Sequence, residues 1–217
     1  MNAPPVQLVV FDLGGVVVRI CRSWEEACCA AGLEFRPAVA SKELIARRRA
    51  VSRQYEIGAI EDEAFYAAMS ASMDGLYSVD EVRRAHLAWI LHEYAGMDRV
   101  IEDLHAAGVA TGVLSNTNPS HWRQLVSGAH GPAKFPTVER ARHVHASHLL
   151  GLAKPDGAIY DEFCRRVAVE PARVLFFDDL AENVAAARAK RWRAEQIDHL
   201  CDPAGQVRGW LTKHAVM

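Results

Sequence analysis

The chain has 217 residues and a mass of 24.0 kDa, which is enough to bury one sizeable core or two small ones. Half of the residues are hydrophobic, about a quarter are charged, and the net charge is −2. This balance is typical of a globular protein and argues against nucleic acid or an anionic membrane as a partner, because nothing in it attracts a polyanion.

The N-terminal apolar run lacks the features of a targeting segment. Asp12 interrupts it and no basic stretch precedes it, so neither a signal peptide nor a membrane span is expected. The five cysteines are odd in number and contain no Cys-x-x-Cys pair, which favours free thiols in a reducing compartment. We therefore expect a cytoplasmic protein, a monomer or a homodimer, that contacts neither membranes nor nucleic acid.

The first predicted element is a strand over residues 6–11, which are mostly apolar or β-branched. A strand of this kind suits the middle of a parallel sheet, where both faces are buried. Asp12 then lies at its carboxyl end, where ligands bind in open α/β sheets, and Gly14 and Gly15 let backbone amides approach an anion. On this stretch alone, a simple turn cap is an equally good explanation of Asp12.

Residues 21–95 have a helical pattern throughout. Ser78 and Glu81, for example, have the spacing of a capping box. An all-helical insert between one buried strand and the next predicts a lid or cap rather than part of the sheet. The predicted helices cover residues 23–32, 41–58, 61–72 and 78–91.

A basic run from Arg47 to Arg53 lies on the second of these helices. Such runs are usually solvated helix faces. The alternative is that Arg53 or a neighbour contacts an anionic substrate from the cap.

From Met97 onward, predicted helices and strands alternate, which indicates a parallel α/β sheet. We expect residues 1–20 and 96–217 to form a Rossmann-like core and residues 21–95 to form the helical cap. The strands of this second part are predicted at residues 109–114, around Val144, at 174–177 and at 195–197, and a loop is predicted over 128–142.

Three histidines, His143, His145 and His148, lie in and after the predicted strand around Val144. They allow two interpretations, a transition-metal site or a solvated cluster at the edge of the sheet.

Five side chains capable of catalysis lie just beyond predicted strands or in loops near them: Asp12, Ser115, Lys154, Asp178 and Asp179. Parallel strands share one carboxyl edge, so these residues can converge although they are distant in sequence. Carboxylates provide oxygen ligands for Mg²⁺, while a lysine and a hydroxyl complement phosphoryl oxygens. A carboxylate that faces phosphorus can act as a nucleophile and form an aspartyl phosphate.

Four ordered segments, which together span nearly the whole chain, resemble the motifs of the haloacid dehalogenase superfamily. The sequence Ser-Asn-Thr-Asn at residues 115–118 and Asp-Leu-Gly at 12–14 are most similar to its subgroup of small sugar-phosphate phosphatases, such as the bacterial glucose-1-phosphate phosphatase. The four segments are Phe11–Val17, Leu114–Asn116, Leu150–Asp156 with Ile159–Tyr160, and Phe176–Asp179 with Asn183.

The resemblance implies a magnesium-dependent hydrolase of small phosphate monoesters that forms an aspartyl phosphate. Asp12 would be the nucleophile and a Mg²⁺ ligand, and the cap would select the substrate. The remaining metal ligands would be the Gly14 carbonyl, Asp178 and, through water, Asp179. The phosphoryl group would be bound by Ser115, Lys154, Leu13, Gly14 and Asn116.

Gly14 departs from the family pattern. The family usually carries a second aspartate two residues after the nucleophile, as general acid and base, and that position is Gly14 here. The chain could act on a good leaving group, or another residue could reach in from the cap. It could also be a weak or inactive relative that binds phosphorylated metabolites. A dehalogenase, which would not need a metal, is a less favoured alternative.

Overall fold

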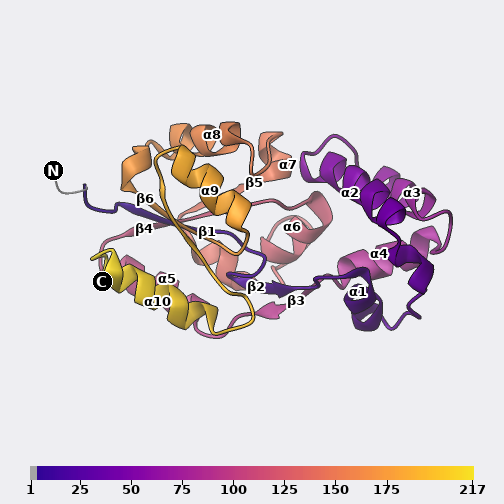
Figure 1. The fold of residues 1–217 in the computed structure, drawn as a ribbon. Coiled ribbons are helices and arrows are strands. Elements are labelled where there is room, and N and C mark those ends of the chain that lie inside the picture. Colours follow the sequence, from indigo (N-terminus) through magenta and orange to yellow (C-terminus); the bar gives the residue numbers. More distant parts are fainter. Residues whose placement is uncertain (1–3) are drawn as a thin grey trace.

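The computed structural model describes residues 4–217, which are organised around a parallel sheet of five strands (Figure 1). The order across the sheet is β5-β4-β1-β6-β7, and all neighbouring pairs are parallel. The predicted strands are confirmed with small shifts of their ends, and β1 is central. The strands are β1 (Leu8–Phe11), β4 (Ala110–Ser115), β5 (His143–Ala146), β6 (Val174–Asp178) and β7 (Arg193–Gln196).

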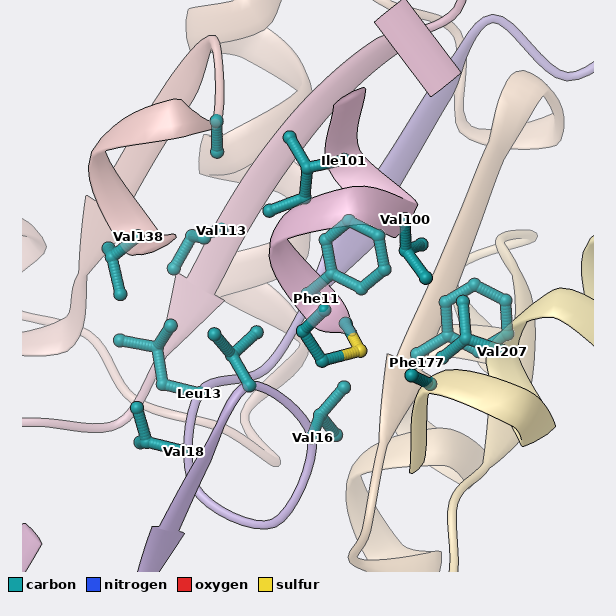
Figure 2. Close-up of a cluster of buried hydrophobic side chains, with 14 of the residues drawn as sticks. Phe11, Leu13, Val16, Val18, Val100, Ile101, Val113, Val138, Phe177 and Val207 are labelled. Atoms are coloured by element: carbon teal, nitrogen blue, oxygen red, sulfur yellow. The ribbon is translucent and has the colours of Figure 1, made fainter. Parts of the chain in front are cut away.

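Helices cover both faces of the sheet because the side chains of β1 alternate between two cores. Val9 and Phe11 point into the core shared with α5 and α10, which Figure 2 shows in close-up. Leu8 and Val10 point into the core shared with α8 and α9. The result is a three-layered, Rossmann-like α/β fold. These helices are α5 (Met97–Ala106), α8 (Gly157–Val167), α9 (Ala181–Ala189) and α10 (Pro203–Lys213).

Short helices complete the connections between strands. The predicted loop over residues 128–142 contains one turn of 3-10 helix. Within the described part of the chain, no helix has both the length and the apolar character needed to cross a membrane. The short elements are α6 (Pro119–Leu125), α7 (Ser147–Leu150) and the 3-10 turns Pro37–Ala40, Pro136–Arg140 and Pro171–Arg173.

Four successive helices, the first four of the chain, lie to one side of the sheet (Figure 1). They enclose a hydrophobic cluster of their own, which includes Trp24, Tyr55 and Phe65. Serine side chains cap three of them, and Ser78 forms with Glu81 the full capping box that the sequence predicts. The helices are α1 (Trp24–Ala31), α2 (Lys42–Glu56), α3 (Asp62–Ser72) and α4 (Val79–Leu87).

The predicted helix through Leu91 is wrong at its end. The helix α4 stops at Leu87, and residues Ile90–Glu93 form the strand β3, antiparallel to β2 (Val18–Ile20). Residues 90–93 form a strand because residues 18–20 extend beyond the main sheet, where their backbone groups need hydrogen-bond partners. Each of the two segments supplies these partners to the other. Residues 21–95 are therefore not entirely helical.

A stacked pair of buried histidines joins α4 to α6. The rings of His86 and His121 have centroids 4.0 Å apart and planes 11° apart. Asn118 caps α6 by accepting from the His121 backbone amide at 3.0 Å, so its Nδ2 faces His121 Nδ1 at 3.1 Å. Because His121 Nε2 lies 2.8 Å from the His86 carbonyl oxygen, Nε2 donates and Nδ1 accepts. The neutral His121 ring therefore forms both hydrogen bonds, one with Asn118 and one with the His86 carbonyl.

Protonation of this pair opposes folding. Burial lowers the pKa of His121 from 6.5 to about 4, and burial with the adjacent His121 lowers the pKa of His86 well below its usual value. The unfolded chain therefore binds more protons than the folded chain between about pH 4 and 6.5. Stability is fully present above pH 6.5 and is lost as the pH falls through that window.

We predict that lowering the pH from 7 to 5 costs about 2 kcal/mol of unfolding free energy through His121 alone, at about 1.4 kcal/mol per pKa unit. The variant His121→Gln should lose correspondingly less than the wild type, measured by urea unfolding at both pH values. The exposed His130→Gln is the matched control and should behave as the wild type. If His121→Gln keeps the pH dependence of the wild type, His121 is not the residue whose protonation destabilises the fold.

Candidate active site

The carboxyl ends of three strands bring the predicted catalytic residues together. Asp12 follows β1, Ser115 ends β4 and Asp178 ends β6, and all three are buried. The Asp12 backbone amide donates to the Phe177 carbonyl at 2.8 Å, which holds Asp12 beside the end of β6. The convergence that the sequence predicts at this edge is therefore present.

Lys154 lies between two of the carboxylates. Its Nζ is 2.9 Å from Asp12 Oδ1 and 2.7 Å from Asp178 Oδ2, and its side chain is 1% exposed. Burial alone would lower the pKa of Lys154, but Asp12 and Asp178 raise it above its usual value. The lysine is thus the cationic counter-ion of these two carboxylates.

Asn116 fixes the backbone of Lys154. Its Oδ1 accepts from the Lys154 amide and its Nδ2 donates to the Lys154 carbonyl, each at 2.8 Å. The side-chain amide of Asn116 is therefore engaged by protein, although the residue also lines the cavity described below. A role for Asn116 in phosphate binding remains a prediction.

The carboxylate of Asp178 is held on every side. Leu180 donates its backbone amide to Oδ1 at 2.9 Å, and Asn183 Nδ2 lies 3.0 Å from Oδ1 and 3.1 Å from Oδ2. Asn183 belongs to the fourth motif, but its sequence gave no indication of this particular contact. It orients Asp178 from the first turn of α9.

Arg22 contributes a contact that the sequence did not reveal. Its Nη1 lies 2.7 Å from Asp179 Oδ2. Gly15, at φ +88°, makes room for this pair, since a Cβ there would lie 2.6 Å from Asp179 Oδ2 and still closer to Arg22. Arg22 lies two residues after β2, whose pairing with β3 was not predicted from the sequence.

The site holds more negative than positive charge. Ligand atoms of Asp12, Asp178 and Asp179 lie within 4.8 Å of one another, against the two cations Lys154 and Arg22. Burial raises the pKa of Asp12 to about 6; Lys154 opposes this shift, and the charges of Asp178 and Asp179 add to it. Burial also raises the pKa of Asp179, opposed by Arg22.

This arrangement suits a divalent cation with oxygen ligands. Asp12 Oδ1 and Asp179 Oδ2 are buried and accept no well-aligned hydrogen bond, although each lies at ion-pair distance from a cation. Within residues 4–217, the three aspartates are the one group of potential ligands gathered closely enough to hold a metal. The three histidines His143, His145 and His148 form no such group.

The carboxyl edge of the sheet, where Asp12, Ser115, Lys154 and Asp178 lie, is called the catalytic edge below. A cavity of about 580 Å³ connects it to the four helices α1–α4. Leu13, Gly14 and Ser115 line it from the sheet side. One face of α2, from Ile45 to Glu56, lines it from the helical side, and most of the remaining wall is apolar. Leu13 and Gly14 are therefore placed beside the catalytic edge, as predicted, while their binding roles remain predictions.

The basic run on α2 divides into residues of different environment. Arg47 is exposed and pairs with Glu43 and Asp74, as expected of a solvated face. Arg48 instead stacks over Trp24, at 5.3 Å from the ring centroid, and lines the cavity. Arg53 donates from Nη1 to the Lys154 carbonyl at 3.4 Å, so this helix contacts the segment that carries the buried lysine.

Two curated proteins resemble part of the chain. Phosphatase MT3486 of Mycobacterium tuberculosis is 28% identical over 134 residues, which are 62% of this chain and 58% of that protein. Sesquiterpene phosphatase astK of Aspergillus oryzae is 26% identical over 136 residues, 63% of this chain and 66% of that protein. The chain thus matches about three fifths to two thirds of the length of these relatives.

Solved structures share the fold. A HAD family enzyme from Bacteroides thetaiotaomicron has a TM-score of 0.77 at 19% identity, covering 94% of this chain and all of that one. It has also been crystallised with magnesium and inorganic phosphate. A dehalogenase has a TM-score of 0.64 at 18% identity, covering 88% and 84% of the two chains.

The family model for haloacid dehalogenase-like hydrolases matches residues 6–189, which include every residue of the catalytic edge described above. The match extends over most of the chain, and the buried aspartates and lysine lie where the four motifs meet. The protein belongs to the haloacid dehalogenase-like hydrolases.

Proposed function

We propose that the protein is a magnesium-dependent phosphatase that hydrolyses small phosphate monoesters through an aspartyl phosphate on Asp12. The observation that carries the proposal is the buried Asp12 carboxylate, placed between Lys154 and the acids Asp178 and Asp179. The relatives named as phosphatases, and the magnesium and phosphate bound to an enzyme of the same fold, support it.

In this proposal, Asp12, Asp178 and the Gly14 carbonyl would hold one Mg²⁺, with Asp179 acting through water. The metal would supply positive charge that offsets the carboxylates and the phosphoryl oxygens. Asp12 attacks phosphorus and the ester oxygen leaves. Lys154 and the Ser115 hydroxyl bind phosphoryl oxygens, and Asn116 keeps Lys154 in place.

Residues 21–95 act in this proposal as a cap that selects the substrate. The cavity volume of about 580 Å³ suits a small molecule. Arg48, Arg49, Ser52 and Glu56 lie on one face of α2 and line the cavity, and their polar groups can bind hydroxyls. This face supports a small sugar phosphate as the substrate.

A second candidate substrate is the phosphate ester of an apolar alcohol. Phe35, Val39, Met69 and Trp89 contribute to an extended apolar wall of the cavity. Apolar surface of this kind stabilises a hydrocarbon chain by about 0.8 kcal/mol per buried methylene. The relative named as a sesquiterpene phosphatase also favours this candidate.

We predict that the purified protein releases phosphate from p-nitrophenyl phosphate with Mg²⁺ and that EDTA abolishes the release. The variant Asp12→Asn should lose roughly 10³-fold or more of the activity, because it lacks the nucleophile. The exposed Asp161→Asn on α8 is the matched control and should retain activity. Chloride release from 2-chloropropionate in EDTA would instead support a dehalogenase.

We predict that Lys154→Met abolishes phosphate release and destabilises the Mg²⁺-free protein by about 3–5 kcal/mol, since two buried carboxylates lose their counter-ion. Urea unfolding with and without Mg²⁺ tests this, and the metal should recover part of the loss. Lys190→Met removes a surface pair with Asp161 and should cost about 1 kcal/mol or less. A Lys154→Met protein as stable as the wild type would contradict the role of Lys154 as the counter-ion of the two carboxylates.

We predict that the wall of the cavity determines which ester is preferred. The values of kcat/KM for glucose 1-phosphate and for farnesyl phosphate, measured side by side with Mg²⁺, distinguish the two candidates. At least a tenfold preference, about 1.4 kcal/mol, for the sugar supports the first candidate, and the opposite preference supports the second.

A further inference from the structure

The position of the missing acid is filled by another side chain. A Cβ at Gly14 would lie 2.8 Å from Ile20 Cδ1, on the strand β2. Ile20 therefore occupies the volume that a side chain at position 14 would need. Any proton donor for the leaving group must come from elsewhere in the cavity.

Two carboxylates line the cavity, Glu25 and Glu56. Glu25 is exposed in the first turn of α1. Glu56 is only partly exposed, on the face of α2 that lines the cavity. Among the described residues, none forms a hydrogen bond or an ion pair with the Glu56 carboxylate. The charge of Arg53 acts on this carboxylate by lowering its pKa.

The end of α2 that carries Glu56 packs on the catalytic side of the molecule. Arg53, one turn earlier, donates to the Lys154 carbonyl at 3.4 Å. Gly58, two residues later, sits so close to the segment after β5 that a Cβ there would lie 2.7 Å from the His148 carbonyl oxygen. Contacts on both sides of Glu56 in sequence thus hold this turn against the sheet domain, where α2 meets α7 (Figure 1).

We propose that Glu56 supplies the general acid and base that Gly14 lacks, an inference that rests on the proposed phosphatase function. As the bond from Asp12 to phosphorus forms and the ester bond breaks, the Glu56 carboxyl gives its proton to the leaving oxygen and an alcohol departs. The Glu56 carboxylate then takes a proton from the water that attacks the aspartyl phosphate. Inorganic phosphate leaves and Asp12 is regenerated.

The environment of Glu56 suits this role. Burial raises the pKa of Glu56, partly opposed by Arg53. A carboxyl whose pKa is moved toward neutral is a better proton donor at physiological pH than an exposed one. Its free carboxylate and its place in the cavity that Ser115 also lines set it apart from the paired acids of the cap.

The test compares esters whose leaving groups differ in their need for a proton. p-Nitrophenol leaves as a stable anion, whereas an alkyl alcohol needs protonation. For Glu56→Gln we expect kcat/KM to fall by about 10²–10⁴-fold for butyl phosphate and by less than about threefold for p-nitrophenyl phosphate. Because kcat/KM covers only the steps up to formation of the aspartyl phosphate, the comparison isolates the acid role.

The retained p-nitrophenyl phosphate activity also shows that the variant folds. Glu61→Gln, an exposed residue outside the cavity with the same change of charge, is the control and should match the wild type for both esters. An equal fall for both esters, or no fall for either, would overturn the role of Glu56. A wild type without phosphatase activity, indistinguishable from Asp12→Asn, would overturn the proposed function itself.

Discussion

The buried ion pair network of Lys154 is the interaction on which the rest of the catalytic edge depends. Two carboxylates from separate strands, Asp12 and Asp178, lie against one ammonium group that water scarcely reaches. Removing one member of such a network leaves a buried charge without compensation. Asn116 and Asn183 have no charge of their own, yet they fix the two ends of this network through hydrogen bonds.

The sequence was most informative where local pattern and global topology agree. The apolar runs predicted the strands, and because parallel strands share a carboxyl edge, the polar residues after them predicted where the site lies. The β3 strand, the Arg22–Asp179 pair and the clamp of Asn116 on Lys154 were not predictable in this way. Each depends on partners far apart in sequence, and the residues concerned have no distinctive local pattern.

The helical side of the cavity combines two kinds of surface. The face of α2 presents arginines, a serine and a glutamate, while much of the remaining wall is hydrocarbon. Under the proposed function, we expect such a cavity to favour amphipathic molecules, since each part of the ligand contacts a matching surface. The charge on α2 and the apolar wall are therefore separate determinants of ligand specificity. A few substitutions can change one of them without changing the other.

The bond from Arg53 to the Lys154 carbonyl links two parts of the molecule that have different tasks. A rotation of α2 away from the sheet breaks this bond and moves Glu56 in the same step, because both residues lie in the last turns of one rigid helix. Opening to solvent and loss of the catalytic arrangement are then a single event. In the proposed mechanism, the position of α2 against the sheet therefore also keeps water away from the aspartyl phosphate.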